Sequence, residues 1–337
     1  MDRFYCTLAE LIDDLENEGI KAWKEATILE KIRAASVFIE SVMGNFIPIT
    51  EAKRMDGEGG IDLEVPALLA ITSLVDDTLT LTTSDYLLYP RSRLWANGPY
   101  DRITIDPDAP SLSAWSVGDD VIVITGRWGY YEETKATGAS VSQADTTGTS
   151  LMVDNASAIS PGAVLLIESE QELVEATGAA TDSTANLGED LDTSEEEIDL
   201  NNAALVSVGE ILKIDFEQMR LLDKSSNTCV VMRGYNGTKR TTHASGADVY
   251  VYRTFTVKRG ANGTTAAIHS AKAVSRYVAP ADVSGLCKQL AILALKLAQS
   301  GYAGRVGNPD LGEVFYFDQY PKKAIEAVAH NYFYPGL

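Results

Sequence analysis

The chain has 337 residues, 45% of them hydrophobic, and a formal net charge of −20 at pH 7. This length allows two or three domains with buried cores, and the negative charge disfavours binding to nucleic-acid phosphates. The cysteines Cys6, Cys229 and Cys287 have no motif spacing, which argues against a disulfide scaffold or a zinc finger and fits a reducing site of synthesis. Residues 1–5 show no basic region ahead of an apolar run, and no stretch is apolar for long enough to span a bilayer. We therefore expect a soluble protein without a signal peptide.

Residues 7–46 predict two helices. Thr7 and Glu10 have the spacing of a capping box at the start of the first helix, and Gly19 is expected to end it. In the second helix, apolar residues recur at helical spacing as far as Gly44, which predicts the end of that helix.

Residues 47–135 predict β-structure. Short runs of alternating or β-branched residues are separated by Gly, Pro and Asp. The expected strands are 61–66, 70–75, 79–81, 86–89, 102–105 and 121–124. A stretch rich in Ala, Thr, Ser and Gly follows at 136–150, and we expect it to be a polar linker.

The region from 151 to 278 contains two internal repeats. In the first repeat, two stretches match at one constant offset, and each predicts a strand, a Gly turn and an alternating strand that ends in Glu-Gln, at 165–171 and 212–218. The matched residues are Asn155, Ala156, Gly162, Ile167, Glu170 and Gln171 in one stretch and Asn202, Ala203, Gly209, Ile214, Glu217 and Gln218 in the other.

The second repeat is the phrase Arg-Gly-x-Asn-Gly-Thr followed by a histidine. Each copy comes after a strand-like run, and Asn-Gly favours a tight turn with positive φ. The equivalent positions of the two histidines indicate that they pack or hydrogen-bond across the turn rather than bind a metal. The residues of this structural turn motif are Arg233, Asn236, Gly237 and His243 in the first copy and Arg259, Asn262, Gly263 and His269 in the second.

The order of the repeats indicates that one β unit is inserted into a hairpin turn of another. Both copies of the first repeat precede both copies of the second, and exposed loop tips tolerate insertions. We therefore expect an inserted β domain at 146–278, in which 151–177 and 253–278 form one unit and 198–252 form the other, nested between them. Two tandem units that exchange halves are the alternative.

The join between the two units is strongly acidic. Acidic residues gather between Glu168 and Asp199 without a Lys or Arg among them, and we expect a solvated acidic loop near 176–197. Their spacing lacks the alternation and internal Gly of a calcium loop, so we expect no metal site.

Helices return at the end of the chain. Pro280 precedes an amphipathic run that closes near Gly301, and Pro321 opens a further helix over 322–332. Because each helix needs a partner for its apolar stripe, we expect the N- and C-terminal helices to form one helical body. The predicted fold class is α+β, with a core of 1–145 and 279–337 that holds this helical body and a β-rich segment, and an inserted, duplicated all-β domain.

The sequence contains no constellation typical of catalysis. GxSxG, HExxH, P-loop and GxGxxG motifs are absent, and the repeat explains two of the three histidines. We expect no enzymatic activity and no cofactor. A glycosidase with a pair of carboxylates is the enzymatic alternative that an acidic chain leaves open.

Six segments between residues 1 and 135 are informative through their order along the chain. The segments are 38–48, 56–60, 65–74, 85–90, 98–103 and 124–130. In this order, and with the helical end from about 280, the chain resembles the head–tail connector family of tailed bacteriophages, also called adaptor or head-completion proteins. The Arg-Gly-x-Asn-Gly-Thr phrase also resembles one found in phage structural proteins. The doubled β insertion departs from the compact form of the family.

The resemblance implies a structural virion protein of the neck that is made in the host cytoplasm. Such proteins form an oligomeric ring, usually dodecameric, below the portal protein, join it to the stopper or tail, and extend the DNA channel. A ring of acidic subunits would repel DNA phosphates, so that DNA passes through the channel during ejection without sequence-specific binding. The β insertion is expected to project outward, where it could contact the capsid vertex, and no membrane is involved.

The C-terminal segment of such proteins commonly docks on the portal, so the resemblance implies portal contact near 311–337. The aromatic residues there are typical either of a core or of a partner-binding surface. They are Tyr316, Phe317, Tyr320, Tyr332, Phe333 and Tyr334. The alternative function is a phage surface or decoration module that binds a receptor or glycan through its duplicated β domain. The lack of Trp in 151–278 weighs against it.

Overall fold

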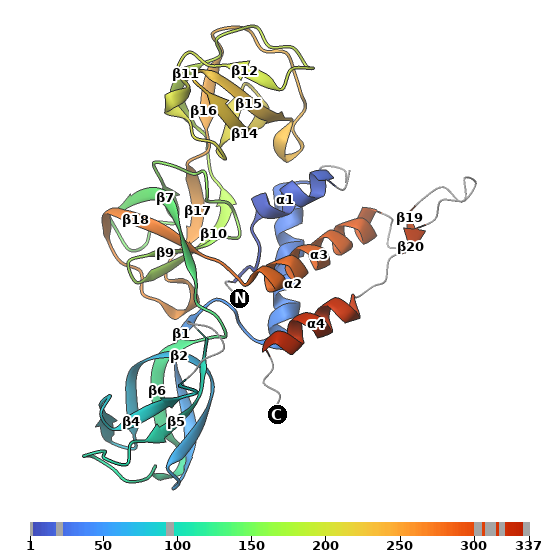
Figure 1. The fold of residues 1–337 in the computed structure, drawn as a ribbon. Helices are drawn as coiled ribbons and strands as arrows, with labels where there is room; N and C mark the ends of the chain where they lie inside the picture. The colour runs from blue at the N-terminus through green and yellow to red at the C-terminus, as the bar shows by residue number, and fades with distance from the viewer. Residues whose placement is uncertain are drawn as a thin grey trace.

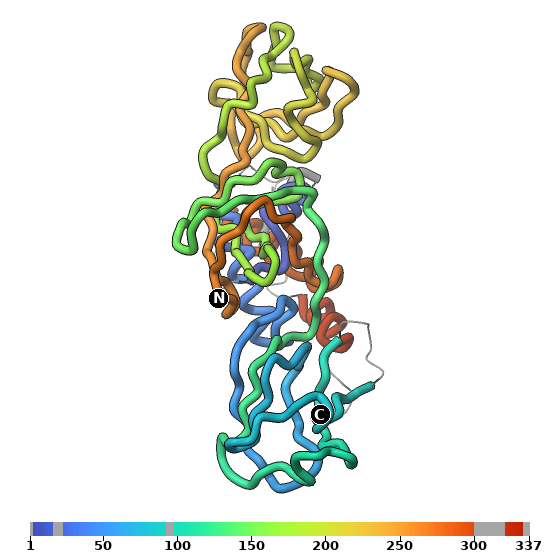
Figure 2. Tube along the Cα trace, turned by 90° about the vertical axis from the view of Figure 1, so that its left-hand side faces the viewer, coloured from blue at the N-terminus to red at the C-terminus, as the bar shows by residue number. Residues whose placement is uncertain are grey.

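The computed structural model describes residues 3–17, 23–91, 98–299, 305–306, 315–316 and 321–332. These residues combine helices with three six-stranded antiparallel sheets, so the fold is α+β. Three β units form a row with the helices along one side of it (Figure 1). The view turned by 90° shows the same row, so the molecule is elongated (Figure 2).

The predicted helices are present. They are α1 (Leu8–Asn17), α2 (Glu25–Met43), α3 (Ala281–Gln299) and α4 (Lys322–Tyr332). The capping box is confirmed, because the Thr7 amide donates to Glu10 Oε2 at 2.9 Å and the Glu10 amide donates to Thr7 Oγ1 at 3.3 Å. Helix α2 ends as predicted at Gly44, which has φ 81° and donates its amide to the Glu40 carbonyl. Gly19 lies outside the described residues.

The helices share one hydrophobic core, although two of them begin the chain and two end it. Leu11 of α1, Ile32 of α2, Leu290 of α3 and Val328 of α4 are all buried in it. Burial of one large aliphatic side chain stabilises a fold by roughly 1.5–3 kcal/mol. We call these four helices the helical unit.

Sheet A comprises β1 (Ile49–Glu58), β2 (Asp62–Asp76), β3 (Leu79–Leu81), β4 (Tyr86–Tyr89), β5 (Tyr100–Ile105) and β6 (Val117–Trp128). Its order is β1-β6-β2-β5-β4, and β3 pairs with β2. The predicted strands 61–66 and 70–75 are one strand, β2, which continues through Pro66. Pro66 has no amide hydrogen, and it lies where the register with β5 shifts, between Glu64 and Leu68. The sequence did not predict β1, whose side chains are mostly polar and partly exposed.

Sheet B has the order β7-β18-β9-β10-β17-β8. Its strands are β7 (Thr134–Gln143), β8 (Ser150–Met152), β9 (Val164–Ile167), β10 (Glu170–Thr177), β17 (Thr254–Lys258) and β18 (His269–Tyr277). The prediction of a polar linker at 136–150 is wrong, because residues 136–143 belong to β7, which pairs with β18, and Ser150 begins β8. Ala139 and Val141 are buried on the inner face of β7, but such small residues give a weak alternation signal. The predicted boundary at 145 is therefore too late, since sheet B begins at Thr134.

Sheet C has the order β11-β16-β13-β14-β15-β12 and a hydrophobic core of its own. Its strands are β11 (Thr181–Asn186), β12 (Glu197–Asp199), β13 (Ile211–Ile214), β14 (Glu217–Ser225), β15 (Thr228–Arg233) and β16 (Asp248–Val251). All of them lie in sequence between β10 and β17 of sheet B. The stretch 176–197 is only partly a loop, because β11 pairs with β16, and the nested unit therefore starts before residue 198.

Short elements complete the fold. They are the 3₁₀ turns η1 (Ala203–Leu205), η2 (Tyr235–Gly237) and η3 (Ala261–Gly263) and the paired strands β19 (Arg305–Val306) and β20 (Phe315–Tyr316). Turns η2 and η3 hold the two Asn-Gly pairs of the repeated phrase.

Candidate functional site: two buried arginine–glutamate–histidine networks

Glu217, the first residue of β14, is the centre of a hydrogen-bond network beside sheet C. Its carboxylate accepts hydrogen bonds from Arg233 Nε and Nη2, both at 2.7 Å, and from the amides of Gly234 at 3.0 Å and Thr241 at 2.9 Å. His243 Nε2 lies 3.0 Å from the same carboxylate. The Glu217, Arg233 and His243 side chains are fully buried. A buried ion pair of this kind is tolerated because the remaining hydrogen-bonding positions are satisfied.

Glu170, the first residue of β10, has the same role beside sheet B. It accepts hydrogen bonds from Arg259 Nε at 2.7 Å and Nη2 at 2.8 Å, and from the amides of Gly260 at 3.0 Å and Ala267 at 2.8 Å. His269 Nε2 lies 2.9 Å from the carboxylate. The two networks therefore use the same atoms at nearly the same distances.

Each histidine lies between two carboxylates. His243 Nδ1 is 2.7 Å from Asp215 Oδ2, and His269 Nδ1 is 3.0 Å from Glu168 Oε2. Asp215 and Glu168 both have positive φ, at 52° and 55°, in the hairpin turns that precede β14 and β10. An imidazolium ring, which donates from both nitrogens, satisfies both contacts at once.

The backbone of the repeated phrase is left-handed at equivalent places. Asn236 has φ 55° and Asn262 has φ 53°, as expected for an Asn-Gly turn. The threonine that follows each Asn-Gly pair bonds both within its own turn and to the neighbouring hairpin. Thr238 Oγ1 donates to the Tyr235 carbonyl at 2.9 Å and accepts from the Gln218 amide at 3.0 Å. Thr264 makes the equivalent bonds to Ala261 and Gln171, both at 2.9 Å.

The two central glutamates are held ionised. Burial alone raises the pKa of Glu217, but hydrogen bonds from Arg233, the Thr241 amide and His243 outweigh it and lower the pKa to about 2. For Glu170, burial is likewise outweighed, by Arg259 and the amides of Ala267 and Gly260, and the pKa falls to about 2. Deep in each network, the carboxylate is therefore charged at neutral pH.

Glu172 breaks the symmetry of the two networks. It is buried in β10, and burial raises its pKa to about 7 although Arg259 acts in the opposite direction. Its Oε1 lies 2.6 Å from Arg259 Nε, whose single hydrogen is donated to Glu170. Gln143 of β7 donates to its other oxygen at 3.3 Å. Glu172 therefore contacts Arg259 without receiving the Nε hydrogen, which is donated to Glu170.

Glu170, Glu172 and His269 are close enough to be considered as metal ligands, since their ligand atoms lie within 4.8 Å of one another. The Arg259 guanidinium, however, contacts both carboxylates, at 2.7 Å and 2.6 Å. The compensating positive charge is thus an arginine, and a metal cation in the same place would be repelled by it. We assign the cluster a structural role.

The turn of the sheet B network docks on the helical unit and on the start of sheet A. Asn262 Oδ1 accepts a hydrogen bond from Arg3 Nη1 at 3.1 Å, and Asn262 Nδ2 donates to Gln171 Oε1 at 2.8 Å. Gln171 Nε2 donates to the Pro48 carbonyl at 3.1 Å. A Cβ on Gly263 would lie only 2.0 Å from the Thr50 carbonyl oxygen, so the two backbones touch here.

The turn of the sheet C network docks on the N-terminal end of α2. Tyr235 is buried in the helical core, and Asn236 Nδ2 lies 3.5 Å from Glu25 Oε2, on the first residue of α2. The other oxygen of Glu25 accepts the Thr177 amide at 3.0 Å. One copy of the phrase therefore attaches the sheet C unit to the start of α2, and the other attaches the sheet B unit to the segment before α1 and to β1.

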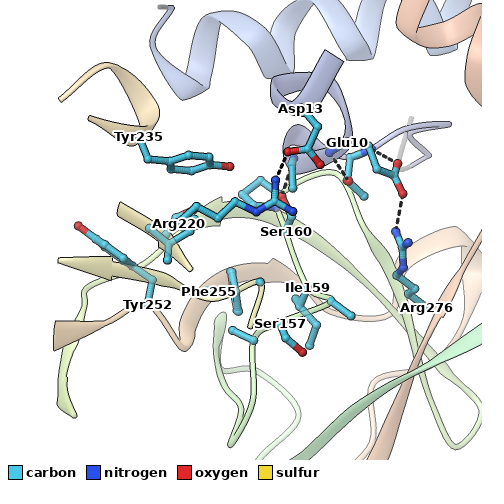
Figure 3. A pocket seen from close by; sticks show the side chains of 18 residues that line it. Glu10, Asp13, Ser157, Ile159, Ser160, Arg220, Tyr235, Tyr252, Phe255 and Arg276 are labelled. Atoms are coloured by element: carbon cyan, nitrogen blue, oxygen red, sulfur yellow. Dashed lines mark hydrogen bonds and ion pairs between the residues drawn. The ribbon is translucent and has the colours of Figure 1, made fainter. Parts of the chain in front are cut away.

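A cavity of about 120 Å³ lies where α1, sheet B and sheet C meet (Figure 3). Figure 3 shows two ion pairs on its wall, between Arg220 and Asp13 and between Arg276 and Glu10, the second at 2.9 Å. Each arginine is therefore matched by a carboxylate. The cavity is large enough for a few water molecules, and it marks a joint between units.

The predicted portal-contact residues are only partly described. The Tyr332 ring packs edge-on against Phe46 at 4.7 Å between centroids, and its hydroxyl donates to Asp282 Oδ1 at 2.6 Å. Tyr332 thus packs against the segment that follows α2 and is bonded to α3. Tyr316 pairs through its backbone with Arg305. Phe317, Tyr320, Phe333 and Tyr334 lie outside the described residues.

Sequence reasoning missed the partner of each repeated arginine. Glu170 and Glu217 were recognised as matched positions, but not as the carboxylates that bind Arg259 and Arg233. The signal was present, because a buried arginine needs an acidic partner and Glu-Gln recurs in both copies.

No helix in the described parts of the chain is long and apolar enough to cross a membrane. The chain matches no family model, no curated protein and no solved structure.

Proposed function

We propose that the chain is a head–tail connector of a tailed bacteriophage. It would form an oligomeric ring, most simply dodecameric, that joins the portal protein to the stopper or tail and extends the DNA channel. The main support for the proposal is that three of the segments on which the resemblance rests, 38–48, 65–74 and 124–130, contact one another in the fold. Asn45 of the first segment accepts the Tyr130 amide on its carbonyl at 2.8 Å and donates from Nδ2 to the Trp128 carbonyl at 2.8 Å. Leu68 of another segment pairs with Trp128 in the sheet.

The contact between α2 and sheet A gives the proposed connector core a fixed geometry. Phe46 lies between Tyr5, at 5.7 Å, and Tyr130, at 5.8 Å between ring centroids. The Tyr5 hydroxyl accepts the Phe46 amide at 3.1 Å and donates to Glu40 at 2.8 Å. Side-by-side packing of such cores around a ring would use the helical unit, as in the family that the chain resembles.

We propose that the sheet C unit is a duplicate of the sheet B unit, inserted between β10 and β17. Two equivalent networks support this, and so does the register of the hairpins. In both hairpins, the Gly before the first strand donates its amide across the hairpin, from Gly162 to the Val174 carbonyl at 2.8 Å and from Gly209 to the Leu221 carbonyl at 2.7 Å. The inserted pair of units would project from the ring, where the capsid vertex or a neighbouring subunit is the candidate partner.

The charge of the chain supports a role beside passing DNA. The net charge is −20, and exposed acidic residues between β11 and β12 include Asp190, Asp192 and Glu195. In a ring, this charge is multiplied by the number of subunits, and repulsion of phosphates would keep DNA from adhering.

Binding to the portal protein is the first test. The purified chain is mixed with the portal protein of the phage that encodes it, and the mixture is separated by size. Co-elution in a fixed ratio supports the connector, and separate elution contradicts it.

The receptor- or glycan-binding alternative has one observation in its favour, since Phe216 in the turn between β13 and β14 is 91% exposed. A single exposed ring is less than the aromatic platform that glycan binding would require, so the connector is preferred.

A further inference from the structure

Two cysteines that are far apart in sequence touch in the core of the helical unit. Cys6 Sγ lies 3.5 Å from Cys287 Sγ. Cys6 precedes α1 and is 2% exposed, and Cys287 lies on α3 and is 0% exposed. The spacing in sequence predicted no pair, so this contact is visible only in the fold.

The surroundings of the pair favour reaction at Cys287. Ser36 Oγ of α2 lies 3.4 Å from Cys287 Sγ and also accepts the Tyr5 amide at 3.1 Å. Hydrogen bonding from Cys6, and then from Ser36 and nearby amides, lowers the pKa of the Cys287 thiol although burial opposes it. The contact with Cys287, together with burial, raises the pKa of Cys6. The two thiols are therefore unequal, with Cys287 better able to carry the thiolate.

We propose that Cys6 and Cys287 are an oxidisable dithiol that closes to an intramolecular disulfide by exchange with a low-molecular-weight disulfide. In the first step, the Cys287 thiolate attacks the small disulfide, forms a mixed disulfide and releases one small thiolate. In the second step, the Cys6 thiolate attacks Cys287 Sγ and releases the second. The net change is two protein thiols oxidised to one disulfide and one small disulfide reduced to two thiols.

The geometry requires little movement. A disulfide has an S–S distance of about 2.05 Å, so the sulfurs must approach by roughly 1.5 Å, which side-chain rotation and a small backbone shift can provide. Cys6 lies in the irregular segment that precedes α1, and a local opening of that segment would admit the oxidant. Cys229 lies in the core of sheet C, in a different hydrophobic cluster, so it does not compete for either partner.

The disulfide would join the two ends of the fold. The loop it closes, from residue 6 to residue 287, contains all the strands of sheets A, B and C. Such a link would restrict the unfolded chain and tie the N-terminal segment to α3. The inference stands apart from the proposed function, although a particle released from a reducing cytoplasm would meet the oxidising conditions it needs.

The test uses the folded full-length chain and oxidised glutathione. After incubation, free thiols are blocked with iodoacetamide, and the protein is digested without reduction and examined by mass spectrometry. We expect a peptide that links Cys6 to Cys287 and is lost on reduction. The Cys229→Ser variant should keep the linked peptide, and Cys6→Ser should lose it and stop at a mixed disulfide with glutathione on Cys287. Thermal unfolding of the oxidised chain should move upward by roughly 5–10 °C relative to the reduced chain.

Three results would overturn the proposal. The first is a folded chain that keeps both thiols free under conditions that link them after unfolding. The second is glutathione attached to wild-type Cys287 without closure to Cys6. The third is cross-linking that proceeds equally well through Cys229. Because the main measurement is made on the wild-type chain, a folding defect in a variant cannot mimic these results.

Discussion

Glu172 and Met219 occupy the same register position in two equivalent hairpins. Glu172 of β10 pairs with Leu165 of β9, and Met219 of β14 pairs with Leu212 of β13. Both side chains are fully buried. One hairpin thus has a carboxylate, Glu172, where the other has a thioether, Met219. In both units the arginine is already paired with another glutamate, Arg259 with Glu170 and Arg233 with Glu217.

Glu172→Met should stabilise the protein. Burial of Glu172 raises its pKa in the folded state to about 7 from 4.5, so its stabilising contribution is present below pH 4.5 and is lost as the pH rises through 7. At about pH 8, replacement by Met should raise the free energy of unfolding by on the order of 1–2 kcal/mol, and near pH 4.5 the gain should shrink. Urea unfolding at the two pH values measures this. Glu175→Met, at an exposed position of the same strand, is the control and should change little. Destabilisation at pH 8 would show that Arg259 needs both acids.

Removal of the central charge of either network should be costly. Glu217→Gln leaves the buried Arg233 with a neutral partner, so we expect a loss of about 3–5 kcal/mol in the stability of the sheet C unit. Glu196→Gln removes an exposed ion pair with Arg240 and should cost less than about 1 kcal/mol. Denaturant unfolding of the two variants gives the comparison, and equal effects would refute the central role of Glu217.

Protonation of Glu170 and Glu217 at low pH should destabilise both networks. The pKa values of Glu170 and Glu217 are lowered to about 2 from 4.5, so their contribution to stability is present above pH 4.5 and is lost as the pH falls towards 2. Circular dichroism during an acid titration should show loss of the sheet B and sheet C units in this range. Glu217→Gln should remove part of that dependence, and an unchanged acid profile in this variant would count against the assignment.

Close backbone contact at Gly263 should make this position intolerant of any side chain. Gly263→Ala adds a Cβ that would lie 2.0 Å from the Thr50 oxygen, at φ +79°. Gly138→Ala has a similar φ of +74° but nothing within 4 Å of the new Cβ, so it isolates the cost of the left-handed backbone, about 1–2 kcal/mol. We expect Gly263→Ala to be the more destabilising variant and to raise protease sensitivity near residues 47–50. Equal stability of the two variants would mean that the turn does not press on sheet A.

The C-terminal aromatic residues should divide into two groups. Tyr332→Ala removes the contact with Phe46 and the bond to Asp282, so it should lower the stability of the helical unit by roughly 3 kcal/mol. Under the proposed function, Phe333→Ala with Tyr334→Ala should weaken portal binding while thermal stability stays close to that of the wild type. Unchanged portal affinity in this double variant would move the contact elsewhere.

Local signals in the sequence predicted local structure well. The Thr7–Glu10 capping box, Gly44 at the end of α2 and the prolines before α3 and α4 act over a few residues, and the structure has them where the sequence indicates. Strand β7 was missed because its buried positions hold small residues, and β2 was divided because Pro66 reads as a break. Both strands pair with partners that are distant in sequence, β7 with β18 and β2 with β5 and β6, so pairing compensates for weak local preference.

Contacts between distant residues could not be predicted in this way. The Cys6–Cys287 pair and the docking of Asn262 on Arg3 depend on how the β units sit against the helices. The arginine–glutamate pairs could have been predicted from the sequence, since the repeats align Glu170 with Glu217 and Arg259 with Arg233. The same arginine–glutamate contact occurs in both β units, and comparison of the two units shows that Glu172 has no counterpart.

Cryo-electron microscopy of the chain co-expressed with the portal protein of its phage tests the connector proposal most directly. The proposal predicts a second ring, of the same symmetry as the portal and stacked below it, with the helical unit in the ring and the sheet C unit projecting from it. A bare portal ring, with this protein free in the same preparation, would contradict it.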